Sequence, residues 1–419
     1  MRILHLIYDD IGNPWLGGGG AVRTLEINRR LAARGHQVIV LCGAYPGAPP
    51  SAPRDGVLYL RVGARGWGGP PRSYLSSRLR YAWGAGALLK DLGYDIVVED
   101  FSPYSPVFAP WRARRGAAVV ASVQNLSGAH AVRKYGRGPR GLLPRLLERP
   151  LLRRFSNVVT VSQGIADEMQ AWWQPGRGGR ITVIPNSAGP AFAAVAGTPA
   201  PPEAPVILFL GRIDPYQKGL DTLLQAYALA APRMPGVRLE LAGTGTPDAV
   251  RQVRAWAAEQ HLAVLDADTD TVPAEAPGGP LVVWRGKLEG ADAVAALRRC
   301  LFLAMPSRYE AWPITALEAA VCGRPVLGTD VTGVRDAAPS TAHGRLVPPD
   351  DPAAFAEAMV ALAGDAGLRH ALGARGRAWA AAFTWDRLAA QQERFYQEVL
   401  AATAPSPAAT REDRDTGPA

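Results

Sequence analysis

Two carboxylates and a helix start between them form the first candidate site. Glu310 and Glu318 are separated by seven residues, among them Pro313, Ile314 and Thr315. Proline suits the first turn of a helix, so we expect Glu310 in the loop before a helix and Glu318 within it. Free backbone N–H groups and the positive dipole end near Ile314 and Thr315 would favour a diphosphate. The carboxylates could then hold hydroxyl groups on either side of it. The alternative is that Glu310 is a surface residue and Glu318 an ordinary charged residue of the helix.

Two cations follow the apolar run 206–210, which we expect to be a buried strand. Arg212 and Lys218 lie in the loop that begins at Gly211. At the carboxyl end of a strand they could neutralise the charge that grows on a departing nucleoside diphosphate. Lys218 is one of only four lysines in an arginine-rich chain, so a coding bias toward arginine does not explain it. The alternative is a solvated basic loop.

A run of glycines at 17–20 follows the first expected strand. Gly18 and Gly19 would let the backbone approach a ligand closely, because glycine carries no Cβ. The run lacks the G-x-G-x-x-G spacing of a dinucleotide site, and no acidic residue follows a second strand at the required place. A flexible turn explains the run equally well.

Apolar runs typical of strands alternate with amphipathic stretches along almost the whole chain, which indicates βαβ units and parallel sheets. The pattern stops at 196–205, a segment rich in Pro and Ala. We expect an α/β protein with two Rossmann-like domains, 1–195 and 196–385, that enclose a ligand cleft. A helix at 386–401 should pack back toward the first domain, and 402–419 should be a disordered tail. Strands are expected at 3–8, 38–42, 96–98, 118–123, 158–162, 181–184, 206–210, 238–242, 281–285, 301–305 and 325–329.

Composition narrows the class of protein. No run of about 18 apolar residues occurs, so no membrane-spanning helix is expected. Three cysteines without metal-ligand spacing favour reduced thiols and a cytoplasmic location. The net charge of +9 fits an anionic partner or a coding bias, and no nucleic-acid-binding motif accompanies it. No Asp-x-Asp pair ends a cleft-facing strand, so we expect no cofactor and no metal ion.

The motifs, in this order, resemble the retaining GT-B enzymes of glycosyltransferase family 4, the group 1 glycosyltransferases. The specific part of the resemblance is the pair formed by Gly211-Arg212…Lys218-Gly219 and Glu310-x7-Glu318. Supporting matches extend over most of the chain: the glycine run at 17–20, Arg34-Gly-His-Gln-Val, Val161-Ser162, Ile184-Pro-Asn186, Ala242-Gly-Thr-Gly245, Gly323-Arg-Pro-Val-Leu-Gly-Thr-Asp330, Gly344-Arg-Leu-Val-Pro348 and Phe383-Thr-Trp-Asp386.

The resemblance implies a GT-B fold and transfer of a sugar from a UDP- or GDP-linked donor to an acceptor hydroxyl, with retention of the anomeric configuration. It implies that Arg212 and Lys218 bind the diphosphate, that Glu310 contacts sugar hydroxyls, and that these three are the catalytic residues. Glu318 would hold the ribose. The implied donor-binding residues are Gly18, Gly19, Gly211, Arg212, Lys218, Lys287, Leu288, Glu310, Pro313, Ile314, Thr315 and Glu318.

Two places depart from the family pattern. Many relatives carry Gly and Phe after the first glutamate, where this chain has Ala311 and Trp312. Many also carry a histidine after the strand at 118–123, where this chain has Gln124 and Asn125. Gln124 can hydrogen-bond a sugar or acceptor hydroxyl but cannot titrate. In the family mechanism the donor phosphate can take the acceptor proton, so activity is still expected, while the donor sugar stays open.

The segment 133–155 mixes arginines with leucines. One interpretation is a helix that packs its leucines on the first domain. The other is a membrane-surface helix, with peripheral attachment to the anionic inner membrane face and a lipid-linked acceptor in place of a soluble saccharide.

Two other functions are compatible with the same motifs. A nucleotide-sugar 2-epimerase of the same fold should show a carboxylate and histidine set in the cleft, which the sequence does not reveal. A non-catalytic sugar-nucleotide binder should have lost Arg212, Lys218 or Glu310, and all three are present.

Overall fold

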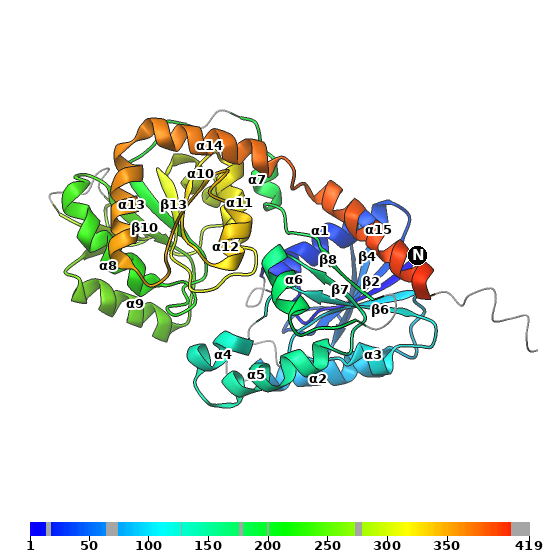
Figure 1. Cartoon of the computed structure of the whole chain (residues 1–419). Helices are drawn as coiled ribbons and strands as arrows, with labels where there is room; N and C mark the ends of the chain where they lie inside the picture. The colour runs from blue at the N-terminus through cyan, green and yellow to red at the C-terminus, as the bar shows by residue number, and fades with distance from the viewer. Residues whose placement is uncertain are drawn as a thin grey trace, which may run out of the picture.

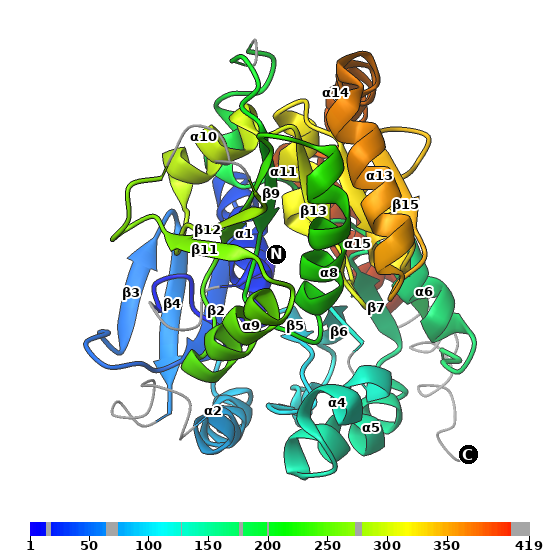
Figure 2. The same cartoon turned by 90° about the vertical axis from the view of Figure 1, so that its left-hand side faces the viewer.

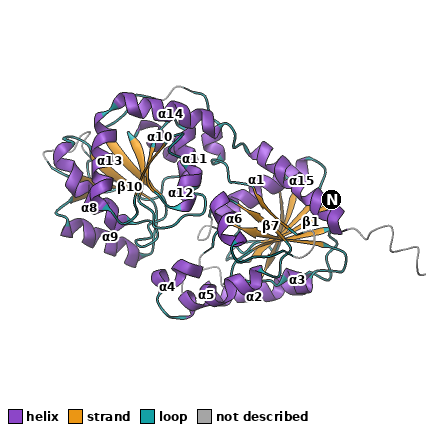
Figure 3. Cartoon of the chain, in the orientation of Figure 1, coloured by secondary structure: helices purple, strands orange, loops and turns teal. Residues whose placement is uncertain are grey.

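The computed structural model describes residues 1–13, 18–63, 74–126, 128–175, 179–198, 201–272 and 279–403. They form two α/β units, each with one sheet between layers of helices (Figure 1). Figure 2 views the second unit in front of the first, and Figure 3 separates strands from helices by colour. Gly17 and residues 404–419, the greater part of the expected tail, lie outside the described residues.

The first unit holds an eight-stranded sheet in the order β3-β4-β2-β1-β5-β6-β7-β8. All neighbouring strands are parallel except β3 and β4. Its strands are β1 (Arg2–Leu6), β2 (Gln37–Gly43), β3 (Ser51–Arg54), β4 (Val57–Val62), β5 (Ile96–Asp100), β6 (Ala118–Val123), β7 (Asn157–Thr160) and β8 (Arg180–Val183). Its helices are α1 (Gly19–Ala33), α2 (Tyr74–Leu88), α3 (Ala109–Arg112), α4 (Gly128–Tyr135), α5 (Pro139–Leu152) and α6 (Gln163–Gln170), and α7 (Pro190–Ala193) follows β8.

The second unit holds a seven-stranded parallel sheet in the order β11-β12-β10-β9-β13-β14-β15. Its strands are β9 (Val206–Leu210), β10 (Arg238–Ala242), β11 (Ala263–Asp266), β12 (Leu281–Trp284), β13 (Phe302–Met305), β14 (Val326–Thr329) and β15 (Gly344–Val347). Its helices are α8 (Leu220–Ala230), α9 (Pro247–Glu259), α10 (Gly290–Arg299), α11 (Ile314–Val321), α12 (Thr332–Ala337), α13 (Pro352–Gly364) and α14 (Ala366–Ala380), with a short 3-10 turn at Ala231–Arg233.

Apart from β8, which lies at a sheet edge, the strands that sequence analysis identified lie inside the sheets. Helices cover both faces of these parallel sheets, so central strands such as β6 and β9 are almost continuous apolar runs. The expected bounds of β6, β9 and β10 agree with the structure. Four strands were missed, β3, β4, β11 and β15, and three of these lie at sheet edges. At an edge the apolar pattern is weaker, and β3 even contains Pro53, which cannot donate to a sheet ladder.

The last helix, α15 (Trp385–Thr403), returns to the first unit and packs beside α1 (Figure 1). Phe395 and Tyr396 are buried with the apolar residues of the first sheet. Trp385 Nε1 donates a hydrogen bond to the carbonyl of Ala188, 2.9 Å away. The chain therefore crosses between the units twice, once before β9 and once after α14.

Two further observations bear on the expected class of protein. In the described part of the chain, no helix combines the length and apolar character needed to cross a bilayer. Cys42, Cys300 and Cys322 are buried free thiols.

Candidate active site

Strand order brings the sequence motifs to one cleft. An open parallel sheet binds ligands at the carboxyl ends of its strands, where the strand order reverses. This point lies between β1 and β5 in the first sheet and between β9 and β13 in the second. The glycine run follows β1, the loop with Arg212 and Lys218 follows β9, and the loop with Glu310 follows β13. Three segments that lie far apart in the sequence thus meet at one cleft.

Two cavities in this cleft share Leu210, Gly211 and Thr315. The larger, of about 730 Å3, is lined by both units. The smaller, of about 300 Å3, also has walls from both units. Every candidate residue named from the sequence lines one or both. The larger cavity is lined by Gly18, Arg212, Lys287, Leu288 and Glu318. The smaller cavity is lined by Gly19, Gln124, Asn125, Lys218, Glu310, Pro313 and Ile314. Both cavities are lined by Gly211 and Thr315.

Lys218 and Glu310 form an ion pair in the smaller cavity. Lys218 Nζ contacts Glu310 Oε1, and Ser307 Oγ donates to the same oxygen at 2.9 Å. Gly219 fixes this arrangement, because its φ of +58° lies in the left-handed region and a Cβ there would lie 2.0 Å from the carbonyl oxygen of Pro306. The loops after β9 and β13 can therefore approach only with glycine at this position.

Arg212 is the more exposed cation. Its side chain is 61% exposed and reaches the larger cavity. Its Nη2 donates to Gln217 Oε1 at 2.9 Å and lies 3.5 Å from Asp214 Oδ2. The guanidinium is thus held by neutral and acidic neighbours on one side and remains accessible on the other.

The start of α11 lies between the two cavities. Pro313 is the residue before the helix, and it makes no side-chain capping hydrogen bond. The Ala316 N–H already donates to the Pro313 carbonyl at 3.1 Å, so it is the N–H groups of Ile314 and Thr315 that keep the capacity to bind an anion. The first unit approaches this point closely, since a Cβ on Gly19 would be 3.0 Å from Ile314 Cδ1.

Glu318 lies one turn further along α11 and faces the larger cavity. Its Oε1 accepts a hydrogen bond from the Gly189 N–H at 3.2 Å. Burial raises the pKa of Glu318 to about 7, which that hydrogen bond only partly offsets. A half-ionised carboxylate at this place can accept hydrogen bonds from ligand hydroxyls.

Asp100 is a functional candidate that sequence analysis missed. It ends β5 at the switch point of the first sheet, beside the strand that leads to Gln124. Burial, and after it the charge of Asp9, raise the pKa of Asp100 to about 7. Its Oδ2 lies 3.5 Å from where a Cβ on Gly20 would be, directly behind the wall of the smaller cavity. The signal in the sequence is an acidic residue that closes a buried apolar strand.

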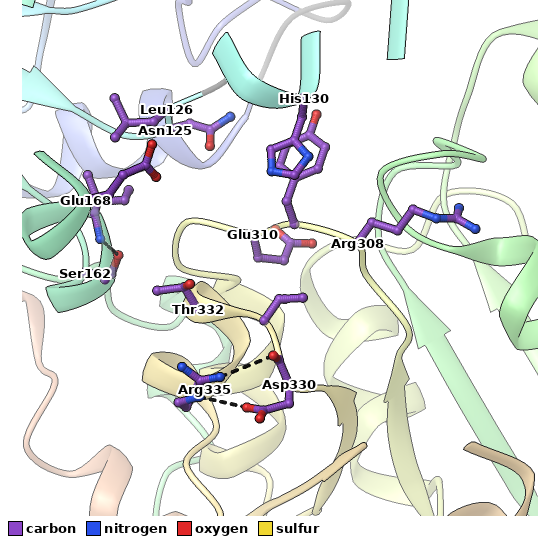
Figure 4. Close-up of a pocket in the computed structure, with 14 residues that line it drawn as sticks. Asn125, Leu126, His130, Ser162, Glu168, Arg308, Glu310, Asp330, Thr332 and Arg335 are labelled. Carbon is purple, nitrogen blue, oxygen red and sulfur yellow. Dashed lines mark hydrogen bonds and ion pairs between the residues drawn. The ribbon is translucent and has the colours of Figure 1, made fainter. Parts of the chain in front are cut away.

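A third cavity, of about 420 Å3, adjoins the smaller one through Asn125 and Glu310 (Figure 4). Residues of both units surround it, including Glu168 and Arg335. His130 lines it as well, with its ring stacked on that of Tyr309 at a centroid distance of 4.3 Å. Hydroxyl, amide and charged groups make this a polar cavity.

A metal site has no support among the side chains that the structure describes. No group of three or more His, Cys, Asp and Glu residues lies close enough there to hold an ion. Independence from metal ions and cofactors remains a prediction.

Two family models match the chain. Residues 204–365 match the model described as glycosyl transferases group 1, and residues 18–187 match the model of the glycosyl transferase 4-like domain. The two matched ranges correspond to the second and first units.

Similar proteins include transferases and synthases. A D-inositol 3-phosphate glycosyltransferase of Jonesia denitrificans is 34% identical over 210 residues, which are 48% of this chain and 45% of that protein. The match therefore spans less than half of that relative. A glycogen synthase of Mycobacterium tuberculosis is 27% identical over 424 residues, which cover 94% of both chains.

Solved structures share the fold over nearly the whole length. Sucrose-phosphate synthase from Thermosynechococcus elongatus gives a TM-score of 0.75 at 22% identity and covers 96% of this chain and 100% of that chain. The Anabaena protein HepE in complex with UDP and glucose gives 0.63 at 17% identity, covering 95% and 99%.

Proposed function

The chain belongs to the group 1 glycosyltransferases, and on this premise we propose that it transfers a sugar from a UDP- or GDP-linked donor to an acceptor hydroxyl with retention of the anomeric configuration. Its fold is the GT-B fold, with two parallel-sheet α/β units. One observation carries the proposal: Arg212, Lys218 and the start of α11 surround the junction of two cavities, each with a glutamate in its wall.

The larger cavity suits the nucleotide. In the proposed complex the base lies near Lys287 and Leu288, and Glu318 accepts hydrogen bonds from the ribose hydroxyls. The diphosphate lies against the first turn of α11 and the cations Arg212 and Lys218. A nucleotide-sugar donor is supported by the similar Anabaena structure, which contains UDP and glucose.

The smaller cavity suits the sugar. Glu310 and Gln124 would hold its hydroxyls, with the anomeric carbon close to the diphosphate. The bond between that carbon and the phosphate oxygen breaks, and the electron pair leaves with the diphosphate, whose charge Lys218 and Arg212 stabilise. The acceptor oxygen forms its bond on the same face, and its proton passes to the departing phosphate oxygen. No metal ion or cofactor takes part.

The third cavity is our proposed acceptor site. It joins the sugar cavity beside Asn125 and Glu310, and its polar lining suits a hydroxyl-rich molecule. A 2-epimerase and a non-catalytic binder are not favoured, because the relatives named above are transferases and synthases.

We further propose that the protein attaches peripherally to an anionic membrane. The segment 101–166 contains eleven Lys and Arg residues and one acidic residue, Glu148. Glu148 is buried, and its Oε1 accepts from the Gly128 N–H at 2.9 Å, so its charge points inward. Leu146 on α5 is 62% exposed, which leaves an apolar side chain among these cations.

A donor screen tests the proposed activity. The protein is incubated with UDP-, GDP- and ADP-sugars, with EDTA and with Mn2+ or Mg2+, and nucleotide release is measured. We expect release from one UDP- or GDP-sugar, unchanged by EDTA. The sugar first formed, observed by NMR before it mutarotates, should have the donor's anomeric configuration. Absence of release from every donor, or activity that EDTA abolishes and Mn2+ restores, would contradict the proposal.

A further inference from the structure

Helix α4 of the first unit contacts the loop that follows β9 in the second unit, residues 211–219. It extends to the side of the first unit that faces the second (Figure 1). Near its end, Lys134 Nζ lies 2.5 Å from Asp214 Oδ2 and donates to Gln217 Oε1 at 2.9 Å. Both charged side chains are largely buried, with 10% of Lys134 and 12% of Asp214 exposed. A desolvated ion pair thus joins the two units beside the proposed diphosphate site.

Asp214 poses an electrostatic problem for this site. It is the only acidic residue between Arg212 and Lys218, and its carboxylate lies 3.5 Å from the Arg212 guanidinium. An unpaired carboxylate there would compete with a diphosphate for Arg212 and would repel the diphosphate as well. Lys134 is positioned to neutralise it.

Gln217 connects the same contact to Arg212. Its Oε1 accepts hydrogen bonds from both Lys134 and Arg212. Its backbone N–H donates to Asp214 Oδ1 at 3.0 Å, which closes the loop on itself. Any movement of α4 away from the second unit therefore removes one of the groups that hold the loop around Arg212.

We propose that Lys134 is a positioning residue that neutralises Asp214 and holds Gln217 by a hydrogen bond. Arg212 is then available to the donor diphosphate when α4 contacts the second unit. Docking of the units and donor binding then favour each other. This inference rests on the proposed function, because it assumes a diphosphate at Arg212 and Lys218.

The ionisation of the pair agrees with this placement. Burial, and next the charge of Arg212, lower the pKa of Lys134. Burial opposes the charge of Asp214, yet its pKa is lowered overall, because the charge and hydrogen bond of Lys134, the Gln217 N–H and the charge of Arg212 together outweigh burial. The Tyr309 ring, 6.0 Å from Lys134 Nζ, faces the pair from the loop after β13.

A double-mutant cycle tests the proposal. Lys134→Met, Asp214→Asn, the double variant and Lys134→Arg are compared with wild type for donor KM, kcat and the Kd of UDP and GDP. We expect Lys134→Met to raise donor KM and nucleotide Kd about tenfold or more, with a smaller change in kcat. Asp214→Asn should bind at least as tightly as wild type, and Lys134→Arg should keep most of the affinity.

The double variant decides between an electrostatic and a merely structural role. If Lys134 acts by neutralising Asp214, adding Asp214→Asn to Lys134→Met should restore affinity to within about threefold of Asp214→Asn alone. Lys90→Met is the matched control and should bind like wild type, because Lys90 is an exposed lysine just after α2 that lines none of the three cleft cavities. Wild-type binding by Lys134→Met, or a double variant as weak as Lys134→Met, would overturn the inference.

The same measurements separate this inference from the proposed function. If wild type binds UDP or GDP and Arg212→Ala weakens binding while Lys134→Met does not, only the role of Lys134 is wrong. If wild type binds neither nucleotide, the proposed function is wrong and the inference falls with it.

Discussion

Lys218 and Arg212 carry the positive charge nearest the proposed diphosphate position, but their surroundings differ. Lys218 is paired with Glu310, whereas Arg212 is largely exposed and bonded to Gln217. Removing Lys218 leaves the Glu310 carboxylate without a cation next to the proposed diphosphate position. Removing Arg212 leaves Gln217 and an Asp214 carboxylate that Lys134 still neutralises. The loss of Lys218 should therefore be the more damaging change.

We expect Lys218→Ala to lower kcat by about 100-fold or more, the scale measured for one electrostatic donor, and Arg212→Ala to lower it somewhat less. Steady-state kinetics of donor hydrolysis or transfer provide the measurement. Arg251→Ala is the control, because this exposed arginine pairs with Asp248 on α9 outside the three cavities. Near-wild-type rates in both cleft variants would show that these cations do not stabilise the leaving group.

Glu318 should make the stability of the free protein depend on pH. Its pKa is about 7 in the folded protein, against an ordinary value of 4.5. The folded state therefore binds the proton more tightly than the unfolded chain, so the stabilising contribution is complete below pH 4.5 and is lost as the pH rises through 7. Glu318→Gln cannot ionise and removes this dependence.

Between pH values below 4.5 and above 7, we expect wild type to lose up to about 3 kcal/mol of unfolding free energy relative to Glu318→Gln. Urea unfolding of both proteins across this range, without nucleotide, gives the difference. Because every other titrating group is common to the two proteins, parallel pH profiles would mean that Glu318 is ordinarily ionised in the fold.

The residues that could be found from the sequence are those with local signals. Arg212 follows an obvious strand, and Glu310 precedes an obvious helix start. Asp100 has only the signal of an acidic residue at the end of a buried strand, and Lys134 has none, because their importance comes from neighbours that only the fold supplies. Asp100 lies behind Gly20, which lines the smaller cavity, and Lys134 contacts Asp214 across the two units.

At the scale of elements, the approach of two loops depends on one glycine. Gly219 precedes α8 with a φ of +58°, and a Cβ there would lie 2.0 Å from the Pro306 carbonyl oxygen. The loop after β13, which carries Glu310, would have to move away from the loop that carries Lys218. The Lys218–Glu310 pair should then be lost together with stability.

We expect Gly219→Ala to lower the unfolding free energy by clearly more than the roughly 1–2 kcal/mol that a left-handed backbone costs a non-glycine residue, and to reduce kcat/KM. Gly116→Ala is the matched control. Gly116 has a φ of +79° but nothing within 4 Å of the position that a Cβ would occupy, so it reports backbone strain alone. Equal destabilisation of the two variants, measured by chemical unfolding, would show that the contact with Pro306 is unimportant.

The central strands of each sheet could be predicted, because a strand that is buried on both faces consists of a continuous run of apolar residues. The edge strands β11 and β15 were missed, because each pairs with a neighbour on one side only and its apolar run is weaker. The segment 133–155 was also interpreted as one helix, but the structure shows two, α4 and α5, separated by residues 136–138. Its leucines divide accordingly, since Leu152 is buried and Leu146 is exposed.

At the scale of the molecule, three helices of the first unit carry an exposed apolar surface beside cations. We call it the Trp83–Trp111 face. Trp83 on α2 is 74% exposed and Trp111 on α3 is 55% exposed. The Arg112 guanidinium lies 5.7 Å from the Trp83 ring, and that of Arg154, just after α5, lies 5.7 Å from the Trp111 ring. Figure 1 shows α2, α3 and α5 along one side of the unit.

Tryptophan next to arginine is the composition of a protein surface that lies at the boundary of a charged membrane. The rings would enter the headgroup region, and each nearby cation would contribute roughly 1 kcal/mol against anionic lipid. We therefore expect the protein to float with vesicles that contain phosphatidylserine or phosphatidylglycerol, not with phosphatidylcholine alone. Salt should release it, because exposed charges are screened within about 10 Å at 0.1 M.

Two variants separate the apolar from the electrostatic contribution. Trp83→Ala with Trp111→Ala should abolish flotation at every salt concentration, whereas Arg145→Gln with Arg154→Gln should weaken it and flatten its salt dependence. The control is Leu229→Ala with Leu368→Ala, which removes two exposed leucines of the second unit and should float like wild type.

The tryptophan variant and the arginine variant should both still release nucleotide from a soluble donor, because none of the substituted residues lines the cleft cavities. If wild type stays with the soluble fraction on anionic vesicles at low salt, the face binds no membrane, and a saccharide acceptor in solution becomes the better explanation of the polar cavity beside Asn125.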